Sequence, residues 1–456
     1  MTIDDTSVTR GEHWYQALLD TESRPVPDSL RATSVGPLEG VDIAPSVFFD
    51  PEFHRLEMTH MWNRAWQMAC REEQIAEPGD TYVYEIGDAS LIVVRGDDGT
   101  IRALHNSCLH RGTMLRTRPG RVDCIRCPYH GLTWNTDGSL REIPSSWDFP
   151  HVEDGDLQLP EARVDTWGGF VFVNLDHYAA PLAEFLEDLP WHFESFPLEE
   201  RWTALHVVRA LPCNWKVAME AFIESYHVMA VHPQLLTTAN DALTQYDVYG
   251  NHVSRMMTAV GVASEHLDPA PDDAAIVSEM LGRRSSDPVE PIEPGTARVV
   301  LAERVRASLE KRTGLDLSKL TDAELLDGIE YFLFPNLMVW AGYLTPFVYR
   351  FRPEGNDPDR CIVDIMKLEP LPESGERPPA AATRFLEPGE TWADVPELGP
   401  FGRVFNQDGA TVGRVQRGLH ASVASRLTLS QYQESRIRHF HATLDAYLAN
   451  DGLARD

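Results

Sequence analysis

The sequence predicts an α+β protein in two parts, a small antiparallel β domain followed by a larger domain of mixed strands with segregated helices. Short strand-like segments separated by DDG, PG and DG turns fill residues 65–180, which predicts the β domain. From residue 185 onward, a helix-like stretch is followed by paired strand-like segments. A chain of 456 residues, with 43% hydrophobic and 24% charged residues, is long enough for two or three globular domains with a sizeable core.

The first part of the chain is expected to form an arm and then the β domain. Residues 1–64 contain the helix-like stretch WYQALLD and are expected to form an N-terminal arm whose helices pack on the larger domain. Residues 65–182 are expected to form the β domain, because segments rich in β-branched and aromatic residues recur there between turns. These segments are TYVYEI, SLIVVRG, TIRALHN and GGFVFVNL.

The larger domain is expected to span residues 183–456. A helix is predicted at PCNWKVAMEAFIESYHVMAVHP, and a long amphipathic helix at LSQYQESRIRHFHATLDAYLAND near the end. Paired strands are predicted at MVWAGYLTPFVYRFRP and CIVDIMKLEPLP. Residues 283–295, RRSSDPVEPIEPG, are polar and rich in proline, which is typical of a surface loop.

The charge of the chain excludes some classes of partner. The formal net charge is -30, which argues against nucleic acid and against an anionic membrane surface as partners. The first residues, MTIDDTSVTR, are acidic and polar, unlike a signal peptide. The longest apolar runs, such as GGFVFVNL, are far shorter than the roughly 20 residues of a membrane-spanning helix. A cytoplasmic enzyme is therefore expected.

Two short motifs in the β domain pair a cysteine with a histidine, as Cys108-x-His110 and Cys127-x-x-His130. Zinc is the commonest ion at such ligands, but zinc sites usually place their cysteines together and their histidines together. Here each motif supplies one of each, which suits a two-iron cluster with both cysteines on one iron and both histidines on the other. Six cysteines in 456 residues are too sparse for a disulfide framework, and Cys124 is expected to be a buried spare thiol.

A second set of metal-ligand residues lies in the predicted helix of the larger domain. Glu220, Glu224 and His227 fall at i, i+4 and i+7, which is one face of a helix. On a regular helix His232 points away from that face, so both histidines reach one metal only if the helix distorts or ends, and Pro233 is consistent with an ending. Two histidines plus one carboxylate form the facial triad of non-haem Fe(II) oxygenases. Among seventeen histidines a single pair is weak support by itself, and the cysteine–histidine motifs before it strengthen it.

Both sets of residues resemble those of Rieske non-haem iron oxygenase α subunits. The two cysteine–histidine motifs, with GLTW directly after the second, resemble a Rieske 2Fe–2S centre. Thr113 and Tyr129 stand where respiratory Rieske proteins carry an extra disulfide-bonded pair, so the motifs are similar to the oxygenase type. The helix-like stretch resembles the catalytic-helix signature N-W-K…E-x-x-x-D/E-x-Y-H-x4-H, with Glu224 at the acid that is most often aspartate and Ala221 where asparagine is common. The other matching residues are Asn214, Trp215, Lys216, Glu220, Tyr226, His227 and His232.

The third iron ligand is selected by the same resemblance, since 70 acidic residues compete for the role. The segment FNQDGATVGRVQRGLHAS is similar to the family's C-terminal segment, in which an acid after a glutamine or glutamate precedes a QRGL-like stretch. Asp408 is the acid in that window. The alternative is that Asp408 only caps the helix that follows it.

The resemblance extends over about residues 45–450 and implies a Rieske domain inserted before a helix-grip catalytic domain with a curved antiparallel sheet. It also implies a head-to-tail ring of three subunits, in which Glu224 connects His227 to His130 of the neighbouring subunit's cluster. The ligands that it implies are Cys108, His110, Cys127 and His130 for the 2Fe–2S cluster, and His227, His232 and Asp408 for a mononuclear Fe(II).

The implied activity is that of a terminal oxygenase, which uses O2 to hydroxylate its substrate. The electrons come from NADH through a separate reductase, with or without a ferredoxin, because the chain has no GxGxxG fingerprint of its own. Whether a β subunit joins the ring is left open. An apolar aromatic or alicyclic substrate is expected from the apolar residues near the motif and in the strands, namely Val228, Met229, Leu333, Phe334 and Trp340.

Other functions are carried as alternatives. Within the oxygenases, these are oxidative demethylation and a quaternary-amine-like substrate. Outside the oxygenases, one alternative is a Rieske electron carrier whose larger domain only docks partners. The other is a zinc-stabilised binding module. Two distinct iron pools in the purified protein dismiss the carrier, and a colourless protein with zinc alone favours the module.

The residues between the two cysteine–histidine motifs are strongly basic. Five arginines stand against the single acid Asp123 within residues 111–126, in a chain of net charge -30. Such a run is most often a solvated loop, but beside a redox centre it also suits the docking of an acidic electron donor. The five are Arg111, Arg116, Arg118, Arg121 and Arg126.

Overall fold

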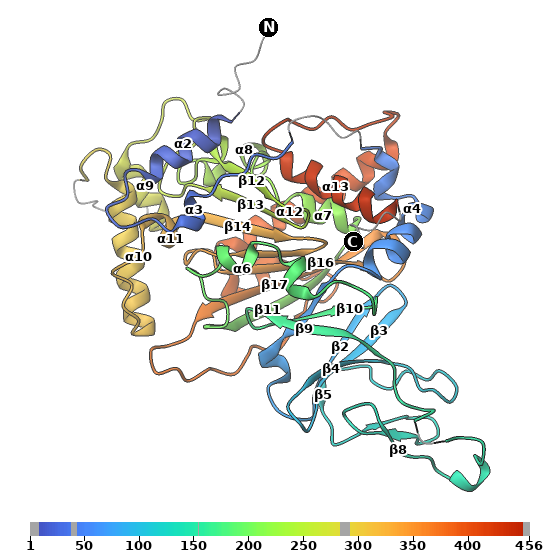
Figure 1. Ribbon diagram of the computed structural model, residues 1–456. Coiled ribbons are helices and arrows are strands. Elements are labelled where there is room, and N and C mark those ends of the chain that lie inside the picture. Colours follow the sequence, from blue (N-terminus) through green and yellow to red (C-terminus); the bar gives the residue numbers. More distant parts are fainter. Residues whose placement is uncertain (1–8, 38–42, 154, 283–291, 450–456) are drawn as a thin grey trace. The chain divides into compact units, whose positions relative to one another are not determined.

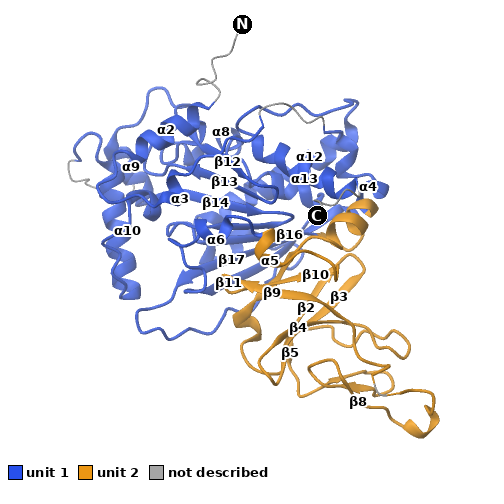
Figure 2. Cartoon of the chain, viewed as in Figure 1, with its two compact units in different colours: residues 1–54, 186–352, 357–456 blue, residues 55–185, 353–356 orange. Residues whose placement is uncertain are grey.

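The computed structural model describes residues 9–37, 43–153, 155–282 and 292–449 (Figure 1). The chain divides into two compact units, residues 1–54, 186–352 and 357–456 in the larger one and residues 55–185 and 353–356 in the smaller one (Figure 2). The predicted division after residues 64 and 182 differs from these boundaries mainly in residues 55–64, which group with the smaller unit.

The smaller unit is built from antiparallel strands, as the sequence predicts. A seven-stranded sheet has the order β1-β10-β9-β4-β3-β2-β5, and a three-stranded sheet has the order β6-β7-β8. The four predicted segments become β2, β3, β4 and β10. The strands are β1 (Gln67–Arg71), β2 (Asp80–Ile86), β3 (Ala89–Arg95), β4 (Ile101–His105), β5 (Gly120–Arg121), β6 (Ile125–Arg126), β7 (Thr133–Trp134), β8 (Leu140–Glu142), β9 (Glu161–Trp167) and β10 (Phe170–Asn174).

The helical pieces of this unit are short. They are the end of α4 (Pro51–Leu56, whose residues 51–54 belong to the larger unit), η2 (Glu57–Trp62), η3 (Glu72–Ile75), η4 (Ser146–Asp148) and α5 (Leu182–Phe185). The apolar core between the two sheets contains both motif cysteines, Cys108 and Cys127, beside Ile92, Leu104 and Trp134. The cysteine-bearing loops are therefore folded into the core of the unit, while their histidines lie at its surface.

The larger unit contains an eight-stranded sheet of order β12-β13-β14-β15-β16-β17-β11-β18. The pairings of β12 through β16 and of β11 with β17 are antiparallel, and the short β18 is parallel to β11. The strands are β11 (Arg201–Leu211), β12 (Gln245–Tyr249), β13 (Val253–Thr258), β14 (Gly328–Leu333), β15 (Leu337–Trp340), β16 (Phe347–Glu354), β17 (Asp357–Pro370) and β18 (Arg384–Phe385). The paired strands predicted between residues 338 and 372 are present, with the first predicted segment divided into β15 and β16 and the second lying in β17.

Helices pack beside this sheet, and the longest are α10 (Ala297–Thr313), α12 (Phe401–Ala421) and α13 (Ser435–Leu448). Buried positions of α12 recur every three or four residues along the helix, which places one face of α12 inward. The predicted C-terminal helix is confirmed as α13, which begins six residues later than the predicted stretch. The remaining helical elements are α2 (Arg10–Leu19), α3 (Asp28–Arg31), η1 (Pro45–Phe48), α6 (Leu189–His192), α7 (Trp215–Glu220), α8 (Val228–Val231), η5 (Pro233–Leu235), η6 (Asp241–Leu243), α9 (Asp273–Met280), α11 (Asp322–Leu326), η7 (Trp392–Asp394) and η8 (Pro396–Leu398).

The single helix predicted over residues 212–233 is wrong, because the structure divides it into α7 and α8. Asn214 caps α7 by accepting the N–H of Lys216 at 3.0 Å. After Glu220 the N–H of Ser225 leaves the helical ladder and donates to the Tyr246 hydroxyl of β12 at 3.1 Å. A tertiary hydrogen bond thus replaces a helical one, and Glu220, Glu224 and His227 do not share a regular helical face.

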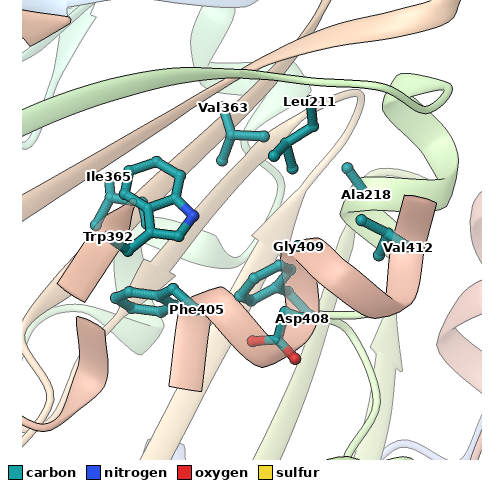
Figure 3. Close-up of a pocket in the computed structure, with 10 residues that line it drawn as sticks. Leu211, Ala218, Val363, Ile365, Trp392, Phe405, Asp408, Gly409 and Val412 are labelled. Carbon is teal, nitrogen blue, oxygen red and sulfur yellow. The ribbon is translucent and has the colours of Figure 1, made fainter. Parts of the chain in front are cut away.

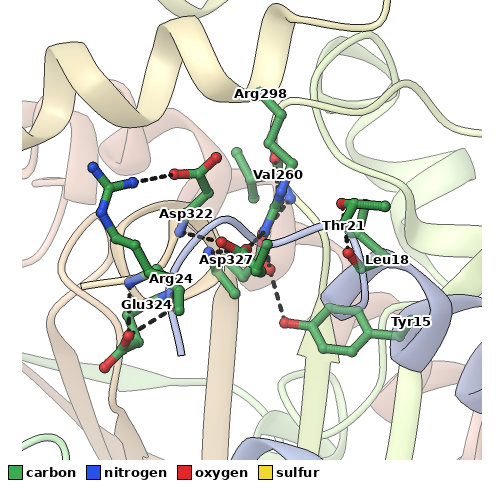
Figure 4. Close-up of polar contacts among 12 residues, drawn as sticks. Tyr15, Leu18, Thr21, Arg24, Val260, Arg298, Asp322, Glu324 and Asp327 are labelled. Carbon is green, nitrogen blue, oxygen red and sulfur yellow. Dashed lines mark hydrogen bonds and ion pairs between the residues drawn. The ribbon is translucent and has the colours of Figure 1, made fainter. Parts of the chain in front are cut away.

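The N-terminal arm is fixed to the larger unit by buried polar contacts (Figure 4). The Tyr15 hydroxyl of α2 donates to Asp327 Oδ2 at 2.7 Å, and Arg298 of α10 donates to both oxygens of the same carboxylate at 2.5 and 2.8 Å. Burial and the Asp327 charge raise the pKa of Tyr15 well above its ordinary value. The fully buried Asp327 thus receives donors from α2, from α10 and from the Val260 N–H, which joins the arm to α10.

A buried ion pair holds α13 on the sheet. Arg436 donates to Glu330 Oε2 of β14 at 2.6 Å, and both side chains are fully buried. The same guanidinium donates to the carbonyl oxygen of Ile223 at 3.1 Å, within the turn that separates α7 from α8. α13 therefore supports the turn that carries Glu224 and His227.

Two remaining expectations concern the surface of the chain. Within the described ranges, no helix is both long enough and apolar enough to span a membrane. Most of the proline-rich segment that the sequence predicts as a surface loop, residues 283–291, lies outside the described residues.

Candidate metal centres

The two cysteine–histidine motifs form loops with the same hydrogen-bond pattern. The Cys108 N–H donates to the Thr113 carbonyl at 2.9 Å, and the Gly112 N–H donates back to the Cys108 carbonyl at 2.8 Å. In the second loop, Cys127 and Leu132 make the first of these bonds at 2.8 Å, and Gly131 makes the second at 3.1 Å. Gly112 and Gly131 have φ of 76° and 83°, a conformation that favours glycine.

The loops bring like ligands together. The Cys108 and Cys127 side chains hydrogen-bond to each other, and both are buried. The His110 and His130 rings lie edge to face with their centroids 4.8 Å apart, and both are exposed. A cysteine pair inside and a histidine pair outside is the separation that a Rieske cluster requires, so this donor set fits a 2Fe–2S cluster.

Backbone N–H groups point at both thiols. Burial raises the pKa of the Cys108 thiol, with the N–H of His110 opposing it. Burial also acts against ionisation of Cys127, but the N–H groups of His130 and Tyr129 outweigh it and lower the pKa of that thiol. Such donors stabilise negative charge on sulfur, which is the form that binds iron.

In the larger unit, the structure brings together the three residues predicted as mononuclear iron ligands. His232 Nε2 lies 2.7 Å from Asp408 Oδ1, and His227 Nε2 lies 3.7 Å from the same oxygen. One ligand atom from each residue lies within 4.8 Å of the others, and no other set of three such residues does so within the described residues. The set is suited to one small cation.

The local structure explains how both histidines reach this point. His227 immediately precedes α8, and His232 ends that helix with φ -124° and ψ 52°. The predicted ending before Pro233 is thus confirmed. Because α8 has only the four residues Val228–Val231, His232 departs from the helical direction in time to meet His227.

Asp408 lies in the middle of α12, on its buried face, and its side chain is 6% exposed. The alternative that Asp408 caps a following helix is therefore wrong, since α12 begins at Phe401. Gln416 on the same face of α12 accepts the Asn214 N–H at 2.9 Å. This bond joins α12 to the start of α7, and so to the segment that carries both histidines.

Each histidine has an acceptor at its other ring nitrogen. His227 Nδ1 lies 2.7 Å from Glu224 Oε1, and His232 Nδ1 lies 3.0 Å from Gln407 Oε1. A neutral ring whose Nδ1 carries the hydrogen presents an unprotonated Nε2, here towards the Asp408 carboxylate. The lone pairs of His227, His232 and Asp408 then face one another and repel. A bound cation removes this repulsion, so the donor set fits an iron ion.

Charge around His227 favours its protonated form when no metal is bound. Burial disfavours that form, but the hydrogen bond and charge of Glu224 outweigh burial, and the pKa of His227 is raised. Glu224 also accepts the backbone N–H of His227 at 3.0 Å. The predicted contact between Glu224 and His227 is therefore present within one chain, although no regular helix produces it.

A small apolar cavity adjoins Asp408 (Figure 3). Its volume of about 10 Å³ is roughly what one water molecule needs. A larger molecule can enter only if lining side chains such as Trp392 and Phe405 move. The lining residues are Leu211, Ala218, Phe222, Val363, Ile365, Trp392, Phe405, Asp408, Gly409 and Val412.

The apolar residues expected near the substrate do not line this cavity. Phe334 stacks on Tyr447 of α13 at 5.1 Å between centroids, inside the core, and Met229 is 42% exposed. Val228, Leu333 and Trp340 are likewise absent from the lining of the cavity at Asp408. The lining of this cavity comes from β11, α7, β17, η7 and α12 and from Phe222, segments that only the fold brings together.

Gln407 is a further residue of this site that the sequence reasoning did not select. Its amide oxygen faces His232, and it immediately precedes Asp408. The signal was available, since the resembled segment places a glutamine or glutamate before the acid.

Comparison with known proteins agrees with the fold and the two centres. The family "Ring hydroxylating alpha subunit (catalytic domain)" matches residues 193–450, and the family "Rieske [2Fe-2S] domain" matches residues 65–153. Because the first match covers more than half of the chain, the chain belongs to the Rieske non-haem iron oxygenase α subunit family. This membership implies a Rieske 2Fe–2S cluster and a mononuclear iron as cofactors.

The relatives differ in the substrates that their names give. The chain is 30% identical to chlorobenzene dioxygenase subunit alpha of Cupriavidus sp. over 197 residues, 40% of this chain and 42% of that protein. It is 34% identical to glycine betaine monooxygenase oxygenase subunit of Chromohalobacter salexigens over 214 residues, 46% of each chain. The matched region thus spans less than half the length of either relative.

A solved structure of a quaternary ammonium Rieske monooxygenase resembles the chain over nearly its whole length. The TM-score is 0.64, the sequence identity is 18%, and the match covers 91% of this chain and 100% of that one. At this identity the likeness concerns the fold alone.

Proposed function

We propose that the chain is the terminal oxygenase component of a Rieske oxygenase system, which hydroxylates a small apolar aromatic or alicyclic substrate with O2. The observation that carries the proposal is the meeting of His227, His232 and Asp408 beside an apolar cavity. Two histidines and one carboxylate leave coordination positions open for O2. The adjoining apolar wall suits a substrate without charge.

The side chains have separate roles in this proposal. His227, His232 and Asp408 would hold the iron, which would supply the redox chemistry for activating O2. Glu224 accepts from His227 Nδ1 and so keeps Nε2 turned towards Asp408. The apolar lining, with Trp392 2% and Phe405 3% exposed, excludes bulk water from the place where the substrate is oxidised.

The electrons are proposed to come from NADH through a partner reductase, with or without a ferredoxin, and to enter at the cluster held by Cys108, Cys127 and the two exposed histidines. His130 is exposed, and the Glu224 side chain, which is 10% exposed, contacts His227. We propose a ring of three subunits in which Glu224 contacts His130 of the neighbouring subunit, and we leave open whether a β subunit joins the ring.

A second candidate substrate class is a quaternary ammonium compound. Three aromatic rings, Phe222, Trp392 and Phe405, line the cavity, and aromatic faces attract such cations. The glycine betaine monooxygenase among the relatives favours this class by its name. Against it, Asp408 is the one charged residue among those that line the cavity, and its carboxylate faces both histidines.

Metal analysis of three variants tests the assignment of the two centres. Cys108→Ser should lose the visible absorbance and the iron of the cluster, because a hydroxyl is a poor substitute for a thiolate at iron. His227→Ala and Asp408→Ala should lose only the mononuclear iron. His420→Ala, on the exposed side of α12, is the matched control and should keep both.

Retained cluster iron in Cys108→Ser, or a colourless wild-type protein with zinc alone, contradicts the proposal. The substrate class is then decided by turnover with reconstituted electron donors. Product formation from neutral aromatic and alicyclic compounds, and none from quaternary amines, is the expected result in mass spectrometry.

A further inference from the structure

Gln407 and Gln234 form a hydrogen-bonded amide pair behind the His232 ring. Gln407 Oε1 lies 3.0 Å from His232 Nδ1 and accepts from Gln234 Nε2 at 2.7 Å. Gln407 Nε2 in turn donates to Gln234 Oε1 at 3.4 Å. The amide pair thus bonds in both directions, and in this arrangement the oxygen of Gln407 faces the histidine.

This orientation favours one tautomer of His232 when the ring binds a metal. The oxygen of Gln407 can only accept, so a neutral His232 ring that gives the lone pair of Nε2 to a metal keeps its hydrogen on Nδ1, towards Gln407. Nε2 then carries a lone pair and faces Asp408 Oδ1 at 2.7 Å. The His232 side chain is only 3% exposed. If the acceptor at Nδ1 is removed, bulk water therefore cannot replace it unless water enters the protein.

Successive residues of α12 therefore contact opposite nitrogens of one ring. Gln407 contacts Nδ1, and Asp408 faces Nε2. Gln234 comes from η5, directly after His232 and Pro233. The amide pair thus links the segment that carries His232 to the helix that carries Asp408.

The two histidines differ in the chemistry of their supports. His227 is held by the Glu224 carboxylate at 2.7 Å, and His232 by a neutral amide at 3.0 Å. Hydrogen bonds to a charged acceptor are shorter and roughly twice as strong as those between neutral groups. The hold on His232 consequently depends more on the orientation of its acceptor, which is what Gln234 fixes.

We propose that Gln407 is a positioning residue of the mononuclear iron centre, and that Gln234 holds Gln407 in place. Gln407 fixes the tautomer and the direction of the His232 ring, so that Nε2 is presented to iron beside Asp408. The proposal rests on the proposed function, because it takes the three residues of that site as the iron ligands.

Fe(II) affinity tests this role directly. The protein is stripped of mononuclear iron, and Fe(II) is titrated under anaerobic conditions in competition with a coloured ferrous chelator. Gln407→Leu, which removes the acceptor at similar volume, should weaken Fe(II) binding about 10- to 100-fold, the usual cost of losing such a partner. Gln407→Glu keeps an acceptor oxygen and should restore binding to wild-type strength or better.

Two controls separate positioning from damage to the fold. The visible absorbance of the 2Fe–2S cluster should be unchanged in every variant. Gln431→Leu, the same substitution at an exposed glutamine, should leave the Fe(II) affinity unchanged. Should Gln407→Leu fail to fold, Gln234→Leu replaces it, since that variant keeps Gln407 but frees its amide; weaker Fe(II) binding is expected there too.

The possible results have distinct meanings. Wild-type affinity in Gln407→Leu, or in Gln234→Leu where the first variant does not fold, overturns the positioning role. An equal loss in Gln407→Leu and Gln407→Glu also overturns it, because the acceptor is then irrelevant. Wild-type affinity in His232→Ala instead contradicts the proposed iron centre itself, so the two failures are distinguishable.

Discussion

Replacing Glu224 by glutamine tests how the carboxylate holds His227. Oε1 lies 2.7 Å from His227 Nδ1, and Oε2 accepts the His227 backbone N–H at 3.0 Å. Glutamine has nearly the same volume but only one oxygen. The NH2 group of the glutamine must therefore face either Nδ1–H or the backbone N–H of His227. One hydrogen bond is lost, and two donor groups then face each other.

The size of the effect follows from these two bonds. A hydrogen bond to a charged group contributes about 1.5–3 kcal/mol, and both side chains are less than a quarter exposed, which limits replacement by water. A loss of about 2 kcal/mol in the orientation of His227 corresponds to roughly a 30-fold change in an equilibrium constant. We therefore expect Glu224→Gln to weaken Fe(II) binding roughly 30-fold and to lose most of the turnover.

The assay measures both quantities on the same preparation. Fe(II) affinity is obtained by anaerobic titration, and turnover is then measured with Fe(II) at saturation. The matched control is Glu220→Gln, because Glu220 Oε1 also lies 2.7 Å from a histidine nitrogen, His441 Nε2, but outside the metal centre. This control should keep the wild-type Fe(II) affinity.

Normal Fe(II) affinity together with normal turnover in Glu224→Gln would refute the reasoning. Normal affinity with lost turnover has a different meaning. It assigns Glu224 to electron transfer between subunits and removes it from the orientation of His227.

The other predictions concern stability and the electron donor. Burial and the charge of Glu22 raise the pKa of Asp322 to about 6, so folding favours its protonated form and its contribution to stability is lost as pH rises from about 4 through 6. Asp322→Asn should therefore gain stability relative to wild type between pH 4.5 and 7.5, by at most about 3 kcal/mol in urea unfolding; an equal difference at both pH values contradicts this. Glu330→Leu should cost about 3–5 kcal/mol in the same assay, because it leaves the Arg436 charge buried without its carboxylate, and a change below 1 kcal/mol would show that the pair is not needed. Charge reversal at the exposed Arg118 and Arg121 should slow reduction of the cluster by its protein donor, most at low salt, and should leave reduction by dithionite unchanged. If reduction by the protein donor and reduction by dithionite slow equally, the arginines of residues 111–126 are not a docking surface.

The structure guides the choice of arginines for that last experiment. Arg116 is only partly exposed, and its guanidinium donates to Thr81 Oγ1 and to the carbonyl of Arg118. Arg111 lies over the Tyr129 ring, with 5.1 Å from the guanidinium carbon to the ring centroid. Reversal of either charge would disturb the domain as well as a docking surface.

The sequence by itself determined the features that depend on short spacing. A cysteine and a histidine two or three residues apart on a glycine-bearing loop predict each of the two cysteine–histidine loops. Local backbone geometry places such ligands. The strands of the smaller unit were likewise predictable, since runs of β-branched and aromatic residues between turns favour strands locally. The ending of α8 before Pro233 also follows from a local rule.

The tertiary structure alone decided the features that depend on residues distant in sequence. His232 and Asp408 are 176 positions apart, so no spacing predicts their contact, and Gln407 joins them only through α12. The break between α7 and α8 arises because Ser225 bonds to Tyr246 of β12, which is stronger than its local helical preference. Local propensities amount to less than about 1 kcal/mol per residue, whereas buried hydrogen bonds and packing between elements decide where a chain departs from them.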